Sequence, residues 1–165
     1  MAKRILVVDD ETDVLDALAR AFRLAGYSVE KAATAAKALA LCKDHSFDLV
    51  ILDFIMPGMS GLEVLNKVRA IHPTIRSIVV SGKVDPQLKE DEVETRLRVE
   101  LEADAFFSKP VSNDRLLETV ERLLTLGKNE NWKDVAERVL HSEKTAGQVR
   151  KIEASLKPRK PSGRK

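Results

Sequence analysis

The sequence predicts an α/β fold built on an open, mostly parallel sheet of five strands. Short continuous apolar runs, rich in β-branched residues, alternate along the chain with longer stretches that have helical periodicity. Such runs are typical of strands that are covered on both faces. The alternation gives five βα units, whose crossovers should be right-handed and should place helices on both faces of the sheet.

The strands are predicted from the apolar runs. Residues 5–8, 49–52 and 78–80 are continuous and strongly apolar, whereas 27–31 and 105–107 are weaker candidates. Between them, apolar side chains recur every three or four residues, which indicates amphipathic helices. They are Val14, Leu15, Leu18 and Phe22, then Leu62, Leu65 and Val68, and finally Leu116, Val120, Leu123 and Leu124. Gly26 stands where the first helix should end, and residues 56–61 form a turn before the third.

Composition bounds the class of protein. The 165 residues, 44% hydrophobic and 33% charged, suffice for one core of ordinary size. The single cysteine, Cys42, excludes an internal disulfide. No stretch reads as a signal peptide or as a membrane span. We therefore expect a soluble cytoplasmic protein with no membrane partner.

Charge is segregated along the chain. Residues 128–165 contain 11 Lys and Arg against 5 Asp and Glu, a net charge of +6. Because the whole chain carries +2, residues 1–127 carry −4. We expect one domain over 1–127 and a separate extension over 128–165.

Polar side chains stand where the predicted strands end. They are Asp9 and Asp10 after the first strand, Asp53 after the third, Ser81 after the fourth, and Ser108 and Lys109 after the fifth. Ligands of open parallel sheets bind outside the carboxyl ends of the strands, so these groups should meet at one edge. Oxygen ligands without His or Cys suit Mg²⁺, which accepts one or two carboxylates and leaves room for phosphate.

Together these motifs resemble the receiver domain of two-component response regulators, over residues 3 to about 126. The motifs are Val8-Asp9-Asp10, Leu52-Asp53 with Met56-Pro57-Gly58-Met59-Ser60-Gly61, Val80-Ser81-Gly82 and Ser108-Lys109-Pro110. Each motif alone is weak, but this order at successive strand ends is specific. The resemblance implies a flavodoxin-like, doubly wound sheet with strand order 2-1-3-4-5. It also implies a phosphorylation switch, not an enzyme, whose partners are a histidine kinase or histidine phosphotransfer protein and a downstream protein target.

The resemblance assigns roles to the acidic residues. Asp53 would be the phosphoacceptor, since a carboxylate can hold a phosphoryl group as an acyl phosphate. Asp10, Asp53 and the backbone carbonyl of Ile55 would hold Mg²⁺, and Asp9 would act through water. Alternatively, Asp53 could be a helix N-cap, and the first helix could be capped from residues 11–13.

The resemblance also assigns the remaining strand-end residues. Lys109, followed by a cis bond to Pro110, would stabilise the phosphoryl charge; the alternative is a solvated surface lysine. Ser81 would hydrogen-bond a phosphoryl oxygen and Phe106 would be the aromatic switch residue, although Phe106 could simply belong to the core. Phe offers no hydroxyl where the family often has Tyr.

Two features depart from the family. Ile55 is apolar where many receivers have a polar side chain, and Lys83 is the corresponding residue beyond Ser81, so the lifetime of the phosphorylated state cannot be read. The segment between Gly82 and Ser108 is longer than usual by about one to two helical turns. We expect it to extend the fourth helix, either changing partner choice or having no role.

The extension at 128–165 has no family pattern. Trp132, Val135, Ala136, Val139 and Leu140 form one apolar helical stripe. Such a helix should dock on its own receiver, on a second copy in a homodimer, or on a partner. The terminal KPRKPSGRK carries five basic residues. It lacks interleaved aromatic residues, so we expect a disordered terminus and no nucleic-acid partner.

Two other functional classes stay open. A DNA-binding transcriptional regulator would need an output domain, so this sequence would be the N-terminal part of such a protein or a variant of it. A phosphohydrolase of the haloacid dehalogenase type also uses an Asp nucleophile, Mg²⁺ and a lysine, but it places the nucleophile in a D-x-D pattern at the first strand. The stretch Asp9-Asp10-Glu11 lacks that spacing.

Overall fold

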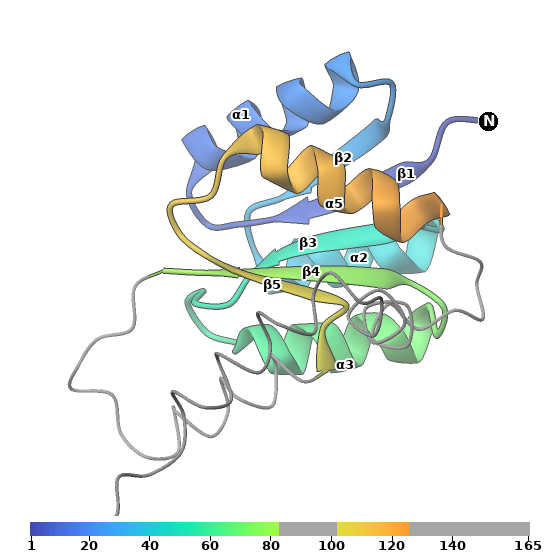
Figure 1. Cartoon of the computed structure of the whole chain (residues 1–165). Helices are drawn as coiled ribbons and strands as arrows, with labels where there is room; N and C mark the ends of the chain where they lie inside the picture. Colours follow the sequence, from blue (N-terminus) through green and yellow to red (C-terminus); the bar gives the residue numbers. More distant parts are fainter. Residues whose placement is uncertain (83–101, 126–165) are drawn as a thin grey trace, which may run out of the picture. The chain divides into compact units, whose positions relative to one another are not determined.

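The computed structural model describes residues 1–82 and 102–125, which form a five-stranded sheet with helices on both faces (Figure 1). The strands are β1 (Arg4–Val8), β2 (Ser28–Ala32), β3 (Leu49–Asp53), β4 (Arg76–Ser81) and β5 (Ala105–Ser108). The helices are α1 (Thr12–Leu24), α2 (Ala35–Asp44), α3 (Gly61–Ile71) and α5 (Asn113–Thr125). None of the helices in these residues combines the length and hydropathy that a bilayer span requires. The expected fourth-helix extension and the C-terminal extension lie outside the described residues.

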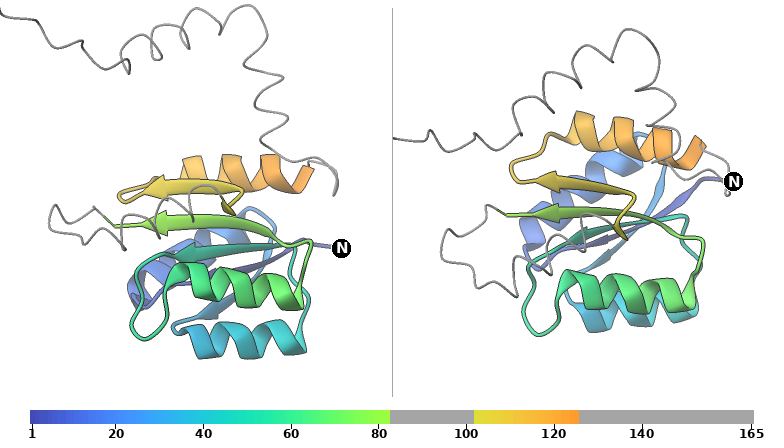
Figure 2. Two further views of the ribbon diagram at one scale, coloured as in Figure 1. Left: turned by 90° about the horizontal axis from the view of Figure 1, so that it is seen from below. Right: turned by 60° about the horizontal axis from the view of Figure 1, so that its bottom comes forward.

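The strand order is β2-β1-β3-β4-β5, and every neighbouring pair is parallel, as predicted. Helices α1 and α5 cover one face, and α2 and α3 cover the other (Figures 1 and 2). The register pairs Val8 with Leu52, Asp53 with Val80, and Ser81 with Ser108. The carboxyl ends of β1, β3, β4 and β5 therefore lie along one edge of the sheet. The strand bounds differ from the predicted ones by at most two residues.

The core explains why the central strands are continuously apolar. All five residues of β3 are buried, and on β1 Leu6 and Val8 pack with Val64 of α3 in one core cluster. Because successive strand side chains point to opposite faces, the intervening residues of β1 and β3 face α1 and α5. A strand that is buried on both faces shows no polar alternation.

The loop between β3 and α3 is fixed by its own residues. A Cβ atom on Gly61 would lie 2.8 Å from the Cα of Phe54, so only glycine fits this close approach. Ser60 caps α3: its hydroxyl accepts a hydrogen bond from the Glu63 N–H (3.3 Å), and its own N–H donates to the Glu63 carboxylate (3.0 Å). This capping box holds the segment that follows Asp53 in a defined position.

A partly buried polar cluster joins the amino ends of β4 and β5. Asp104, just before β5, accepts hydrogen bonds from the Ser77 N–H (2.8 Å) and the Ser77 hydroxyl (3.1 Å). Its carboxylate also pairs with Arg76 (3.3 Å) and with Arg69 of α3 (3.8 Å). We call Asp104, Ser77, Arg69 and Arg76 the Asp104 cluster. It fixes where β5 begins, and therefore where Lys109 follows at the opposite end of that strand.

Candidate functional site

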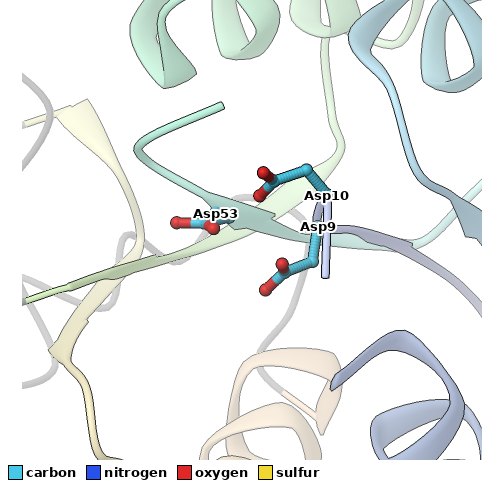
Figure 3. Close-up of side chains that lie close together, drawn as sticks. All are labelled: Asp9, Asp10 and Asp53. Carbon is cyan, nitrogen blue, oxygen red and sulfur yellow. The ribbon is translucent and has the colours of Figure 1, made fainter. Parts of the chain in front are cut away.

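Three carboxylates meet at the carboxyl edge of the sheet. Asp9 and Asp10 follow β1, Asp53 ends β3, and each can offer an oxygen within 4.8 Å of the others. Figure 3 shows their side chains gathered beyond the strand ends. Asp9 and Asp53 are buried, whereas Asp10 is exposed. The structure thus brings together the acidic residues that the sequence singled out.

Backbone amides orient the two buried carboxylates. Asp9 Oδ1 accepts a hydrogen bond from the Glu11 N–H (2.9 Å), and Asp53 Oδ1 accepts one from the Ile55 N–H (3.2 Å). Both bonds span two residues, so the turn after each strand sets the direction of its own aspartate. The second oxygen of each carboxylate stays available to groups from other segments.

Of the two capping alternatives for these acidic residues, the one for Asp53 is wrong. The N-cap of α3 is Ser60, so Asp53 caps no helix that follows it. The N-cap residue of α1 is Glu11, within the range 11–13 of the other alternative, although its side chain makes no capping hydrogen bond.

Lys109 reaches the same point from the end of β5. Its ammonium lies 3.1 Å from Asp9 Oδ2, 3.3 Å from Asp53 Oδ2 and 3.3 Å from Glu11 Oε1. The lysine side chain is only 26% exposed, so it is not a solvated surface lysine. The peptide bond between Lys109 and Pro110 is cis, as the resemblance implies. The contact with Glu11 was not predicted, although Glu11 adjoins Asp9 and Asp10 in the sequence.

The electrostatics of the site follow from burial and from these contacts. Burial and the neighbouring charge of Asp9 raise the pKa of Asp53, and the opposing effects of Lys109 and of the Ile55 N–H do not cancel them. Burial alone would lower the pKa of Lys109. The hydrogen bond to Asp9 and the negative charges of Asp53 and Asp9 outweigh it and raise this pKa to about 12. Lys109 therefore stays charged, and negative charge is in excess around Asp53.

The excess negative charge fits a hard divalent cation. The cluster of Asp9, Asp10 and Asp53 offers oxygen atoms only, which suits Mg²⁺ better than a softer metal. One exposed carboxylate beside two buried ones also leaves a side open to water and to a phosphoryl group. The residues present thus satisfy the chemistry that Mg²⁺ requires.

A cavity of about 460 Å³ lies next to Lys109, between α1, α5 and the strand ends. Its walls are largely apolar and include Leu18 and Leu116, while Asp9, Glu11, Asp53 and Lys109 contribute its charged groups. The low polarity of these walls strengthens the interactions between the charged groups beside them.

Ser81 and Phe106 lie on β4 and β5. The Ser81 side chain is buried and its hydroxyl donates to the Gly82 carbonyl (3.1 Å), while its backbone carbonyl accepts the Lys109 N–H (2.6 Å). Ser81 is thereby placed beside the backbone of Lys109. Phe106 is half-buried and packs against the core cluster of the α2–α3 face. Its packing agrees with a core position and leaves its predicted switch role a prediction.

Ile55 is 59% exposed, among the most exposed large apolar side chains of the described residues. It lies two residues beyond Asp53, in the loop that the capping box fixes. Its apolar side chain therefore faces solvent next to the carboxylates. Lys83 lies outside the described residues.

With this geometry established, comparison with known proteins decides the family. The sequence model of the protein family described as the response regulator receiver domain matches residues 5–121 of this chain. The chain belongs to the response regulator receiver family. Phosphorylation on an aspartate is typical of this family, whose domains act as phosphorylation-dependent switches.

Relatives of this receiver domain differ in length. Sporulation initiation phosphotransferase F of Bacillus subtilis is 33% identical over 131 residues, which cover 78% of this chain and 99% of that protein. Response regulator MprA of Mycobacterium sp. strain KMS is 34% identical, covering 75% of this chain but 51% of the relative. A cyclic di-GMP phosphodiesterase of Thermotoga maritima is 29% identical, covering 86% of this chain and 38% of the relative. The chain thus spans about half or less of the two longer relatives.

Solved receiver structures have the same fold. A CheY-like receiver domain protein from Methanospirillum hungatei superposes with a TM-score of 0.66 at 35% identity, covering 75% of this chain and 94% of that one. The response regulator TrrA of Thermotoga maritima, in complex with Mg²⁺ and BeF, gives 0.61 at 33% identity, covering 73% and 98%.

Proposed function

We propose that this receiver accepts a phosphoryl group on Asp53 from a histidine kinase or a histidine phosphotransfer protein, in a Mg²⁺-dependent reaction. The observation that carries the proposal is the position of Asp53. It is a buried carboxylate 3.3 Å from the Lys109 ammonium and within 4.8 Å of oxygens from Asp9 and Asp10. A nucleophile, a fixed cation and the ligands for a divalent cation therefore converge at one point.

The reaction is a displacement at phosphorus. An oxygen of Asp53 forms the new bond to phosphorus while the bond from phosphorus to the donor histidine nitrogen breaks, and its electron pair leaves with the imidazole. The Lys109 ammonium stabilises the negative charge that spreads over the phosphoryl oxygens. The Ser81 hydroxyl hydrogen-bonds one of these oxygens once it turns from the Gly82 carbonyl.

Asp10, Asp53 and the backbone carbonyl of Ile55 would hold Mg²⁺, with Asp9 acting through a water molecule. When bound, the ion supplies positive charge that offsets the repulsion between the carboxylates and the incoming phosphoryl group. The reaction needs the metal because the single positive charge of Lys109 does not balance the negative charges of the carboxylates around it.

The phosphorylated protein acts as a switch and not as a turnover enzyme. Phosphorylation changes the charge beside Ser81, and Phe106 on the neighbouring strand carries the change to a surface that a downstream protein target or a second copy of the chain reads. Nucleic acid is not a partner in this proposal. The reaction takes place in the cytoplasm, where the free thiol of Cys42 stays reduced.

The proposal is tested by incubating the full chain with acetyl phosphate and Mg²⁺ and measuring its intact mass. We expect the wild type to gain one phosphoryl group and Asp53→Asn to gain none. Asp16→Asn is the control, because Asp16 is an exposed carboxylate of α1 that pairs with Lys31 away from the site. It should be labelled like the wild type.

Two outcomes would contradict the proposal. Full labelling of Asp53→Asn would remove Asp53 as the acceptor. Continuous release of inorganic phosphate, with no labelled protein at any time, would indicate a phosphohydrolase instead of a switch.

A further inference from the structure

Lys109 has no spare hydrogen-bond donor in the unphosphorylated structure. A lysine ammonium has three N–H groups. Here it has three carboxylate partners, Asp9 at 3.1 Å, Glu11 at 3.3 Å and Asp53 at 3.3 Å. To bind an oxygen of a phosphoryl group on Asp53, the ammonium must give up at least one of these partners.

We propose that Glu11 is a positioning residue, which holds the Lys109 ammonium in the unphosphorylated protein and releases it to the phosphoryl group. The inference rests on the proposed function, since it names the residue that controls the availability of Lys109 in that reaction. Glu11 thus slows phosphorylation, because its carboxylate competes with the phosphoryl group for the Lys109 ammonium.

Exposure decides which partner is released. The side chains of Asp9 and Asp53 are 6% and 5% exposed, whereas that of Glu11 is 63% exposed. Because the phosphoryl group is bonded to Asp53 itself, the carboxylates that stay ionised beside it are Asp9 and Glu11, and a buried carboxylate such as Asp9 that loses its cation keeps an uncompensated charge, which is costly. The carboxylate of Glu11 can be solvated by water at once, so breaking its contact costs least.

Within residues 1–82 and 102–125, the side chain of Glu11 contacts Lys109. Although Glu11 is the N-cap residue of α1, its side chain makes no capping hydrogen bond. Glu11 orients Asp9 through its backbone N–H (2.9 Å), which a substitution of the side chain preserves. Both Glu11 and Lys109 line the cavity of about 460 Å³, so the ammonium has space to move without displacing the core.

The test compares Glu11→Gln with the wild type in acetyl phosphate labelling at saturating Mg²⁺. The variant keeps the size of the side chain and loses its charge. We expect Asp53 to be phosphorylated about twofold to fivefold faster, the scale of a partly exposed ion pair. Asp13→Asn is the matched control: Asp13 is an exposed carboxylate of the first turn of α1, and the change should leave the rate unaltered.

A double-mutant cycle shows whether Glu11 acts through Lys109. Glu11→Gln is combined with Lys109→Gln, and urea unfolding midpoints are measured without Mg²⁺, where labelling plays no part. We expect Glu11→Gln to shift the midpoint differently in the presence and absence of Lys109, while Asp13→Asn gives the same shift in both backgrounds.

The inference is overturned if Glu11→Gln labels at the wild-type rate or more slowly, if Asp13→Asn accelerates labelling equally, or if the cycle shows no coupling. Failure of the proposed function gives a different result, because the wild type itself then shows no labelling that depends on Asp53.

Discussion

The two ends of the sheet carry charged clusters of opposite design. At the amino ends of β4 and β5, the single carboxylate of the Asp104 cluster is shared by two arginines and by the N–H and hydroxyl of Ser77. At the carboxyl ends, the single ammonium of Lys109 is shared by Asp9, Glu11 and Asp53, with Asp10 next to them. One cluster surrounds an acid with donors, and the other surrounds a base with acceptors.

The difference separates a structural cluster from a functional one. The hydrogen bonds of Asp104 are satisfied within the protein, so that cluster needs nothing from solution. The carboxylates at the other end exceed the charge of Lys109, and burial together with the negative charge of Asp9 raises the pKa of Asp53. Excess charge of one sign, held in place by backbone amides, is what a site for an external cation requires. Three measurements test this contrast.

The largest effect is expected from Asp104→Ala. The change removes the acceptor of the buried Ser77 N–H and the partly buried carboxylate shared by Arg69 and Arg76. We expect the free energy of unfolding to fall by about 3 kcal/mol, measured by urea denaturation. As a control, Asp16→Ala breaks an exposed ion pair with Lys31. This change should alter the free energy of unfolding by at most about 0.5 kcal/mol. Similar losses in the two variants would refute a structural role for Asp104.

A smaller loss is expected from Lys109→Gln without Mg²⁺. The folded protein raises the pKa of Lys109 from 10.5 to about 12, which corresponds to about 2 kcal/mol of stability at pH 7. Because the folded pKa is the higher one, this contribution is complete below pH 10.5 and is lost as the pH rises through about 12. The difference between wild type and variant in urea denaturation should therefore shrink at alkaline pH. A difference that stays constant from pH 7 to 12 would contradict the assignment.

The smallest effect concerns the cation site. Mg²⁺ at ten times its dissociation constant should raise the free energy of unfolding of the wild type by about 1.4 kcal/mol. Asp10→Asn should be more stable than the wild type without metal, because one repelling carboxylate is gone, and should gain less from Mg²⁺. Asp13→Asn serves as the control and should respond like the wild type. An equal response of Asp10→Asn and the wild type in thermal unfolding would place the metal elsewhere.

The sequence determined the parts of this protein that depend on local pattern. Continuous apolar runs located strands buried on both faces, and the rule that ligands gather at carboxyl ends selected Asp9, Asp10, Asp53, Ser81 and Lys109. The turn signals at 56–61 located the loop after Asp53. The strands, the loop and the meeting of these side chains at one edge agree with the structure, because periodicity and strand ends are properties of neighbouring residues.

Only the tertiary structure decided which distant side chains share a charge. Lys109 and Glu11 are 98 residues apart, and Ser77 and Asp104 are 27 apart. Their contacts depend on strand order, register and side-chain direction together, which no local pattern records. The structure therefore paired the side chain of Glu11, the N-cap residue of α1, with Lys109, and showed that Asp104 anchors the strand leading to Lys109. The physical reason is that burial fixes pairings between segments, whereas sequence periodicity reports only which face of a segment is buried.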